Sequence, residues 1–252
     1  MIEDYAQRST AAQPTILSFT TTNSASQNSQ SQVTLWLLEE LGIDYNLNPF
    51  ERETSGPRKN RAPESLKDTH PLGKSPQLIT PEGRVIIERT AIAKYLIDKY
   101  DTAGKFKLNI DDTENDAIRE EELLSFGGSS LSTIMMVQLI LKFIGDGSPF
   151  FIRPLFRSAF GMLNKAFTGP EIDQMMKYAD SNLKGREYFM GTSNPTRVDF
   201  CFLWYIDLFK MAGNSDLSPY PDLKAWHDRC KARDAWKRSL EKGNGYDMNV
   251  EI

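Results

Sequence analysis

The feature that most constrains the fold is a change of pattern near residue 100 of this 252-residue chain. Before it, short runs typical of strands alternate with segments whose apolar residues recur at helical spacing. After the polar stretch 101–112, the apolar residues follow helical spacing almost throughout. A chain of this length can form two small domains. We therefore expect an α/β domain over 14–100, a linker over 101–112, an all-helical domain over 113–242, and flexible tails at 1–13 and 243–252.

The order of elements predicted in the first half is β-α-β-α-β-β-α, about the smallest α/β layer that makes a domain. Gly42 is placed to end the first helix, and Pro63 to open the second. The triplet Pro81-Glu82-Gly83 is a turn signal that predicts a hairpin between the last two strands. The predicted elements are Thr15–Thr20, Val33–Leu41, Tyr45–Phe50, Ala62–Asp68, Ser75–Thr80, Arg84–Ile87 and Ile92–Tyr100.

The second half is predicted to be a bundle of helices. The longest has Gly127-Gly128 near its middle, where we expect a bend. A later helix opens with Thr196-x-x-Asp199, close to a capping box, with Asp in place of the usual Glu or Gln. The predicted helices are Glu114–Ile144, Phe151–Phe167, Glu171–Leu183, Thr196–Met211, Pro221–Arg229 and Ala235–Glu241.

Composition argues against several kinds of protein. The formal net charge is −4 and no block of Lys or Arg compensates locally, so we expect no nucleic-acid partner. The two cysteines, Cys201 and Cys230, form no Cys-x-x-Cys pair, which argues against a disulfide scaffold, a zinc site and a dithiol motif. We expect both to pack within helices. With only two histidines as well, we expect no metal site.

The chain is expected to be soluble and cytoplasmic. Residues 1–14 carry no apolar run, which argues against a signal peptide. The stretch most similar to a membrane span, Leu131–Ile144, is short for a bilayer and is interrupted by Gln138 and Lys142. We therefore expect no transmembrane segment, and peripheral attachment to a membrane stays open.

Four short segments stand out, in this order: 29–41 (SQSQVTLWLLEEL), 70–76 (HPLGKSP), Ile87-Glu88-Arg89 and Thr196-x-x-Asp199. They resemble motifs of the glutathione transferase superfamily. The match is closest to its fungal and bacterial members with a serine donor, whose first helix reads Ser-x-x-x-Arg-x-x-Trp-Leu-Leu-Glu-Glu-Leu. Together they span about residues 15–205. The resemblance implies a thioredoxin-like domain that binds glutathione, followed by an all-helical domain.

The resemblance also implies which residues bind the tripeptide. Ser75-Pro76 matches a cis-proline that exposes the preceding backbone to the cysteinyl part of glutathione; the alternative is an ordinary trans proline. Glu88 would contact the γ-glutamyl ammonium, or only stabilise the start of a helix. Arg89 replaces the usual Ser and would pair with the γ-glutamyl carboxylate or point to solvent. Lys74 and His70 are candidates for the glycyl carboxylate.

The group that stabilises the thiolate is implied to be Ser29, with Asn28 beside it. Ser29 is equally placed to be a plain helix N-cap. The loop before it, Thr20–Gln27, is several residues longer than the family's, so a donor from 21–26 is a further alternative. Gln30 and Val33 stand where arginines are common in the family.

A second, apolar substrate is expected over the long helix of the second domain, at Phe126, Ser130 and Met135, with packing in the bundle core as the alternative for such residues. The function implied is a glutathione transferase that adds the glutathione thiolate to a hydrophobic electrophile. A glutathione-dependent isomerase, lyase or peroxidase of specialised metabolism, and a non-catalytic ligand-binding homologue, are the alternatives. Glutathione would be the cosubstrate, no metal is needed, and the family implies a homodimer.

Overall fold

The structure, a computed structural model, describes residues 13–19, 30–53, 55–56, 61–108, 116–214 and 216–243. The chain divides into two compact units. One holds the described residues up to Lys107 together with those from Ala232 onward, and the other runs from Leu108 to Lys231. The predicted tails lie outside the described residues, apart from Gln13 and Gly243.

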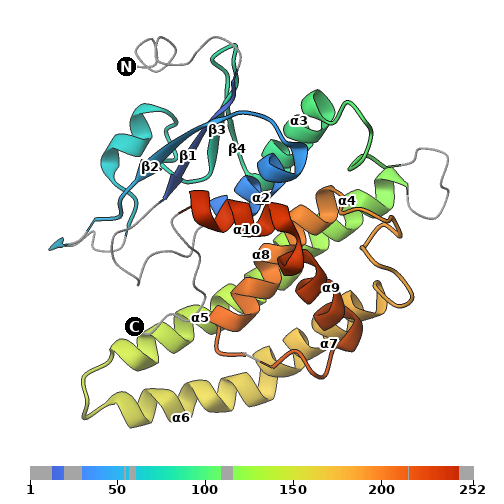
Figure 1. Cartoon of the computed structure of the whole chain (residues 1–252). Helices are drawn as coiled ribbons and strands as arrows, with labels where there is room; N and C mark the ends of the chain where they lie inside the picture. Colours follow the sequence, from blue (N-terminus) through green and yellow to red (C-terminus); the bar gives the residue numbers. More distant parts are fainter. Residues whose placement is uncertain are drawn as a thin grey trace. The chain divides into compact units, whose positions relative to one another are not determined.

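A four-stranded mixed sheet with the strand order β2-β1-β3-β4 forms the base of the N-terminal unit (Figure 1). β1 (Thr15–Phe19) pairs in parallel with β2 (Asn46–Phe50). β3 (Gln77–Ile79) pairs antiparallel with β1 and with β4 (Val85–Ile87), which confirms the predicted hairpin. β2 contains Pro49, which is tolerated because this strand lies at the edge of the sheet.

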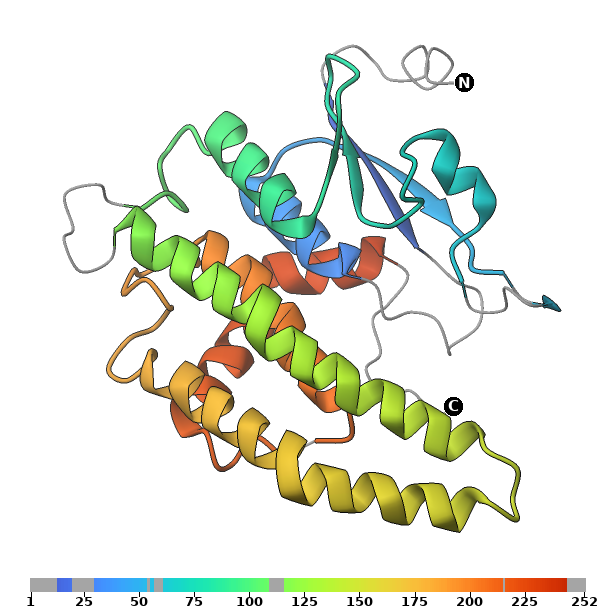
Figure 2. The same cartoon turned by 180° about the vertical axis from the view of Figure 1, so that it is seen from behind.

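Two helices cover one face of this sheet, α2 (Ser31–Leu41) and α3 (Arg89–Tyr100), and η3 (Glu64–Asp68) lies on the other face (Figures 1 and 2). Gly42 ends α2 as predicted, with φ of 63° in the left-handed region that glycine adopts without strain. The short helix predicted after Ala62 is a 3₁₀-helix. Pro63 lies just before it in an extended conformation rather than inside its first turn.

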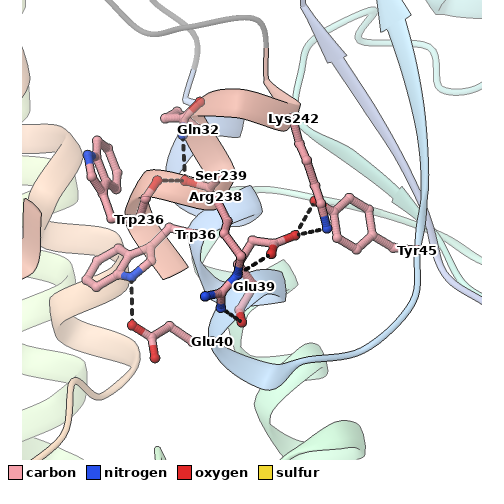
Figure 3. A network of polar contacts seen from close by, with 9 residues as sticks. All are labelled: Gln32, Trp36, Glu39, Glu40, Tyr45, Trp236, Arg238, Ser239 and Lys242. Carbon is pink, nitrogen blue, oxygen red and sulfur yellow. Dashed lines mark hydrogen bonds and ion pairs between the residues drawn. The ribbon is translucent and has the colours of Figure 1, made fainter. Parts of the chain in front are cut away.

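Every residue of α2 from Ser31 to Glu39 is buried, because a last helix, α10 (Asp234–Lys242), packs against it (Figure 3). The indole rings of Trp36 and Trp236 meet edge to face with centroids 5.9 Å apart. The sequence places α10 in the second domain, whereas its contacts group it with the N-terminal unit. The domain limits expected from the sequence otherwise remain a prediction.

The C-terminal unit is helical throughout its described elements. Its central helix is α8 (Arg197–Met211). All residues of α8 from Arg197 to Phe209 are buried, as expected for a helix with apolar residues on every side. The elements are α4 (Ala117–Ser125), η4 (Phe126–Leu131), α5 (Ser132–Gly147), α6 (Arg153–Leu163), η5 (Asn164–Thr168), α7 (Gly169–Ser181), α8 (Arg197–Met211) and α9 (Pro221–Ala232).

Two π-helical turns, η4 and η5, join helices where the sequence predicts a bend and a break. η4 makes α4 and α5 one continuous helix through Gly127, and η5 does the same for α6 and α7. A Cβ at Gly127 would lie only 2.3 Å from the ring of Tyr205 on α8. The glycine is therefore needed for the close approach of the two helices, and the bend expected at Gly127-Gly128 stays a prediction.

The predicted cap of α8 is confirmed. The Oδ2 of Asp199 accepts hydrogen bonds from Thr196 N (2.7 Å) and Thr196 Oγ1 (2.9 Å). Its Oδ1 accepts from Phe189 N (3.1 Å) and from Trp226 Nε1 (2.8 Å). One buried carboxylate therefore ties α8 to α9 and to the loop before α8.

The two cysteines are buried in helices, as predicted. The stretch Leu131–Ile144 lies within the 31-residue helix Ala117–Gly147, which is long and apolar enough to cross a membrane by length and composition alone. One such helix is weak support for a span, since the core helix of a soluble protein passes the same test. The apolar helix is thus longer than the stretch 131–144, and the absence of a transmembrane segment stays a prediction.

Candidate functional site

Polar groups gather where the chain leaves β1, enters α2 and approaches β3. The Ser75-Pro76 peptide bond is cis, as the resemblance implies, and Pro76 is buried. Ser75 Oγ donates to the carbonyl oxygen of Leu17 over 3.1 Å and lies 2.8 Å from the Oγ of Ser31. A hydroxyl has one proton, and Ser75 uses its own on Leu17, so Ser31 donates to Ser75. This hydroxyl relay joins the start of α2 to the cis-proline loop.

Ser31 was not among the residues expected at the site. A serine at the first position of a helix predicts only a cap, and its side chain is fully buried. The signal that could have found it is its position in the first-helix motif, two residues after Ser29.

The buried side chain of Gln77 fixes the loop before Ser75 through hydrogen bonds to its backbone. Gln77 Nε2 donates to the carbonyl oxygens of Lys74 (2.9 Å) and Leu66 (3.3 Å). The side chain of Lys74 is exposed, so its ammonium can reach a ligand. His70 is half-buried, and its Nδ1 accepts from Leu72 N over 3.3 Å. Of the two candidates for the glycyl carboxylate, Lys74 is the more open.

The junction between β4 and α3 holds a strained residue. Glu88 has φ of 67° and ψ of 120°, and it is the one residue other than glycine with positive φ in the described part of the chain. Residues other than glycine rarely adopt this backbone conformation. It costs about 1–3 kcal/mol and is found most often at functional sites. Glu88 is exposed. The backbone therefore turns its carboxylate outward, just before the helix.

Arg89 does not point to solvent. Its side chain is only 7% exposed, and its Nη1 donates to the Oε1 of Gln30 over 3.0 Å, across 59 residues of sequence. Gln30 stands where the resembling proteins commonly carry arginine, and Arg89 stands where they carry serine. The pair therefore keeps a guanidinium beside the start of α2, but the guanidinium comes from Arg89, the first residue of α3.

Several expected residues cannot be placed against these groups. Ser29, Asn28 and the alternative donors at 21–26 lie outside the described residues. The described groups supply a buried guanidinium, an exposed ammonium, an outward carboxylate and a pair of hydrogen-bonded hydroxyls at the start of α2. A helix N-terminus also favours negative charge. The arrangement suits a ligand that carries both carboxylates and an ammonium.

The residues expected to bind a second substrate differ in exposure. Met135 is fully buried. Phe126 is half-buried. Its ring meets that of Tyr178 edge to face, with centroids 4.9 Å apart, and stacks with that of Phe202, with centroids 6.2 Å apart. Both have the packing role considered above as the alternative. Ser130 is exposed, and a substrate role for the three stays a prediction.

Within the described residues, no group of three or more His, Cys, Asp or Glu side chains could hold a metal ion. This is a statement about the described segments, and the expectation that the chain needs no metal stays a prediction.

The fold and this site define a two-domain protein whose first domain is thioredoxin-like. Family models match both halves: "Glutathione S-transferase, N-terminal domain" over residues 29–99 and "Glutathione S-transferase, C-terminal domain" over residues 158–243. The chain belongs to the glutathione S-transferase family.

Named relatives and solved structures agree with this family. The chain is 28% identical over 220 residues to glutathione S-transferase 3 of Schizosaccharomyces pombe, covering 86% of this chain and 85% of that one. It is 23% identical to glutathione S-transferase 1 of Saccharomyces cerevisiae, covering 85% and 92%. The crystal structure of a glutathione S-transferase from Actinobacillus pleuropneumoniae is similar with a TM-score of 0.72 and 23% identity, covering 95% and 97%.

Proposed function

We propose that this protein binds glutathione at the cis-proline edge of its N-terminal unit and transfers the glutathionyl group to a small hydrophobic electrophile. The observation that carries the proposal is the Arg89–Gln30 pair, 3.0 Å apart, which keeps a cation at the start of α2 although both family positions are changed. A guanidinium held at a helix N-terminus, which also favours negative charge, suits the binding of an anionic ligand.

Each part of the tripeptide has a partner in this assignment. The backbone of Ser75, before the cis Pro76, pairs with the cysteinyl unit. Glu88 receives the γ-glutamyl ammonium, and Arg89 pairs with the γ-glutamyl carboxylate through charge-assisted hydrogen bonds. Lys74 binds the glycyl carboxylate, with His70 as the weaker candidate.

The chemical step uses the thiol of glutathione as nucleophile. The thiol releases its proton to water, and Ser29, with Asn28 beside it, donates a hydrogen bond to the thiolate near the N-terminus of α2, where the helix dipole favours negative charge. The sulfur then forms a bond to the electrophilic carbon, with release of a leaving group or protonation of the adduct. Holding both reactants close together supplies the remaining acceleration.

Solved relatives support glutathione as the ligand. A glutathione transferase homologue from Lodderomyces elongisporus was solved with two glutathione molecules per subunit, at 18% identity and a TM-score of 0.66, covering 91% of this chain and 98% of that one. A further structure, from Phanerochaete chrysosporium, contains oxidised glutathione. At this identity the likeness supports the fold, and the transfer of the ligand to this chain is part of the proposal.

Calorimetric titration with glutathione tests the assignment. Arg89→Gln should weaken binding by about tenfold or more, because a hydrogen bond to a charged group contributes about 1.5–3 kcal/mol. Arg84→Gln, which changes an exposed arginine on the β3–β4 turn, is the matched control and should bind as the wild type does. The exchange Gln30→Arg with Arg89→Ser restores the family's arrangement and should recover binding.

Thiol ionisation followed by ultraviolet absorbance separates binding from chemistry. Ser29→Ala should bind glutathione and fail to ionise it. If Ser29→Ala still ionises the thiol, the donor lies elsewhere, and the 21–26 loop is the place to look. Binding without turnover on a panel of enones, aryl halides and hydroperoxides would favour the non-catalytic alternative. Failure of the wild type to bind millimolar glutathione would refute the proposal. A homodimer and a cytoplasmic location stay predictions.

A further inference from the structure

An unusual amount of apolar surface is gathered on one part of the C-terminal unit. Of the fourteen large apolar side chains exposed in the described residues, eleven lie between Met136 and Phe167. This stretch comprises most of α5, the turn 148–152, α6 and η5, and we call it the apolar hairpin. α5 and α6 run side by side in it (Figure 2). Exposed apolar groups concentrated in this way mark a surface that binds something.

The exposure is greatest at the tip of the apolar hairpin. Phe150 is 83% exposed and Phe151 is 70% exposed, and their rings meet edge to face at 5.6 Å. α6 follows directly, and none of its residues is buried. Its Leu155 and Met162, seven positions apart and so on one face, are each 71% exposed. The helix is therefore packed on one side only and leaves an apolar stripe open.

The charge of the apolar hairpin is opposite to that of the whole chain. Residues 132–168 contain four basic side chains, Lys142, Arg153, Arg157 and Lys165, and one acidic side chain, Asp146. The chain as a whole has a net charge of −4. Asp146 pairs with Lys142 (2.8 Å) and Arg157 (2.7 Å), so no acidic group of this stretch is left without a cation.

We propose that the apolar hairpin docks on the surface of an anionic phospholipid bilayer. Amphipathic helices that lie in the bilayer interface combine large apolar residues with Lys and Arg in this manner. Phe150 and Phe151 would enter the boundary of the acyl chains, and the basic side chains, in excess over the one carboxylate, would meet lipid phosphates. A second copy of the same face is disfavoured as occupant, since it would bring like charges together.

Flotation of the full chain with lipid vesicles tests this. The wild type should float with vesicles of phosphatidylcholine and phosphatidylserine, and much less with phosphatidylcholine alone. Added salt should weaken the binding, because it screens exposed charges. The double change Phe150→Ser with Phe151→Ser should reduce vesicle binding by at least about tenfold. The double change Arg157→Gln with Lys165→Gln should remove the preference for anionic lipid.

The matched control is Ile118→Ser, which removes an equally exposed apolar side chain of the same unit, 75% exposed and outside the apolar hairpin. It should bind vesicles as the wild type does. Far-ultraviolet circular dichroism and thermal denaturation of all variants report whether the fold is intact. Three results would overturn the proposal: no wild-type binding to anionic vesicles, binding that survives loss of both phenylalanines, or an oligomer that dissociates in the phenylalanine variant while no vesicle binds.

Discussion

Gln32, in the first turn of α2, donates from its Nε2 to the Oγ of Ser239 on α10 over 2.8 Å, across 207 residues of sequence (Figure 3). Ser239 in turn donates to the carbonyl oxygen of Trp236 (2.7 Å). Both side chains of the first bond are buried. The last described helix of the chain is therefore fastened to the helix that begins at the candidate glutathione site.

Ser239→Ala should lower the free energy of unfolding by about 1–3 kcal/mol, since it leaves the buried Nε2 of Gln32 without this acceptor. Chemical denaturation measures the change. Ser158→Ala, on the exposed surface of α6, is the matched control and should change stability by less than about 0.5 kcal/mol. Equal effects of the two substitutions would show that the bond contributes nothing.

The carboxylate of Glu39 links stability to acid pH. Burial raises its pKa, but hydrogen bonds from Lys242, Tyr45 and Arg238 outweigh burial and leave the pKa below its ordinary value of 4.5. A depressed carboxylate pKa contributes stability above the unfolded value, and this contribution is lost as the pH falls through the folded value. Glu39→Gln should therefore cost stability at neutral pH, with a difference from wild type that shrinks progressively below about pH 4.5.

Denaturation at a series of pH values tests this expectation. Glu241→Gln, which changes an exposed glutamate on the neighbouring α10, is the control and should change the free energy of unfolding at neutral pH by less than about 0.5 kcal/mol. A difference between wild type and Glu39→Gln that stays constant from neutral to acid pH would contradict the assignment.

Asp199→Ala should be among the most damaging substitutions in the C-terminal unit. The carboxylate is fully buried and accepts four hydrogen bonds, from Phe189, Thr196 and Trp226. Its removal loses a helix cap and leaves buried donors unpaired, so we expect a loss of about 3 kcal/mol or more in the free energy of unfolding. Thr196→Ala removes the cap hydroxyl and one methyl group but keeps the carboxylate of Asp199, and should cost about 1 kcal/mol. Thermal and chemical denaturation that ranked the two in the opposite order would refute this account.

Gly127→Ala and Gly161→Ala separate helix propensity from packing. Alanine is favoured over glycine inside a helix by about 1 kcal/mol. At Gly161 nothing lies within 4 Å of the added Cβ, so this change should be neutral or stabilising. At Gly127 the Cβ would meet Tyr205 at 2.3 Å, and overpacking should make the change destabilising by about 1–3 kcal/mol. Stabilisation by both substitutions would mean that Tyr205 moves aside at no cost.

Local patterns determined much of this protein. The alternation of strands and helices up to residue 100, the Pro81-Glu82-Gly83 hairpin, the glycine that ends α2 and the Thr196–Asp199 cap are all encoded by residues close together in sequence. Each depends on backbone periodicity or on a hydrogen bond within a few residues, which spacing alone predicts. The family motifs added the cis bond before Pro76.

Contacts between distant segments were decided only by the tertiary structure. Nothing in the spacing of Gln30 and Arg89 predicts that they meet, because 59 residues separate them and the fold brings β4 and α3 to the start of α2. α10 lies against α2, where the rings of Trp36 and Trp236 are in contact. The position of α10 in the chain, after the helices of the C-terminal unit, does not predict this contact. The need for glycine at position 127 is also decided by the tertiary structure, because the ring of Tyr205 on α8 leaves no room for a Cβ there.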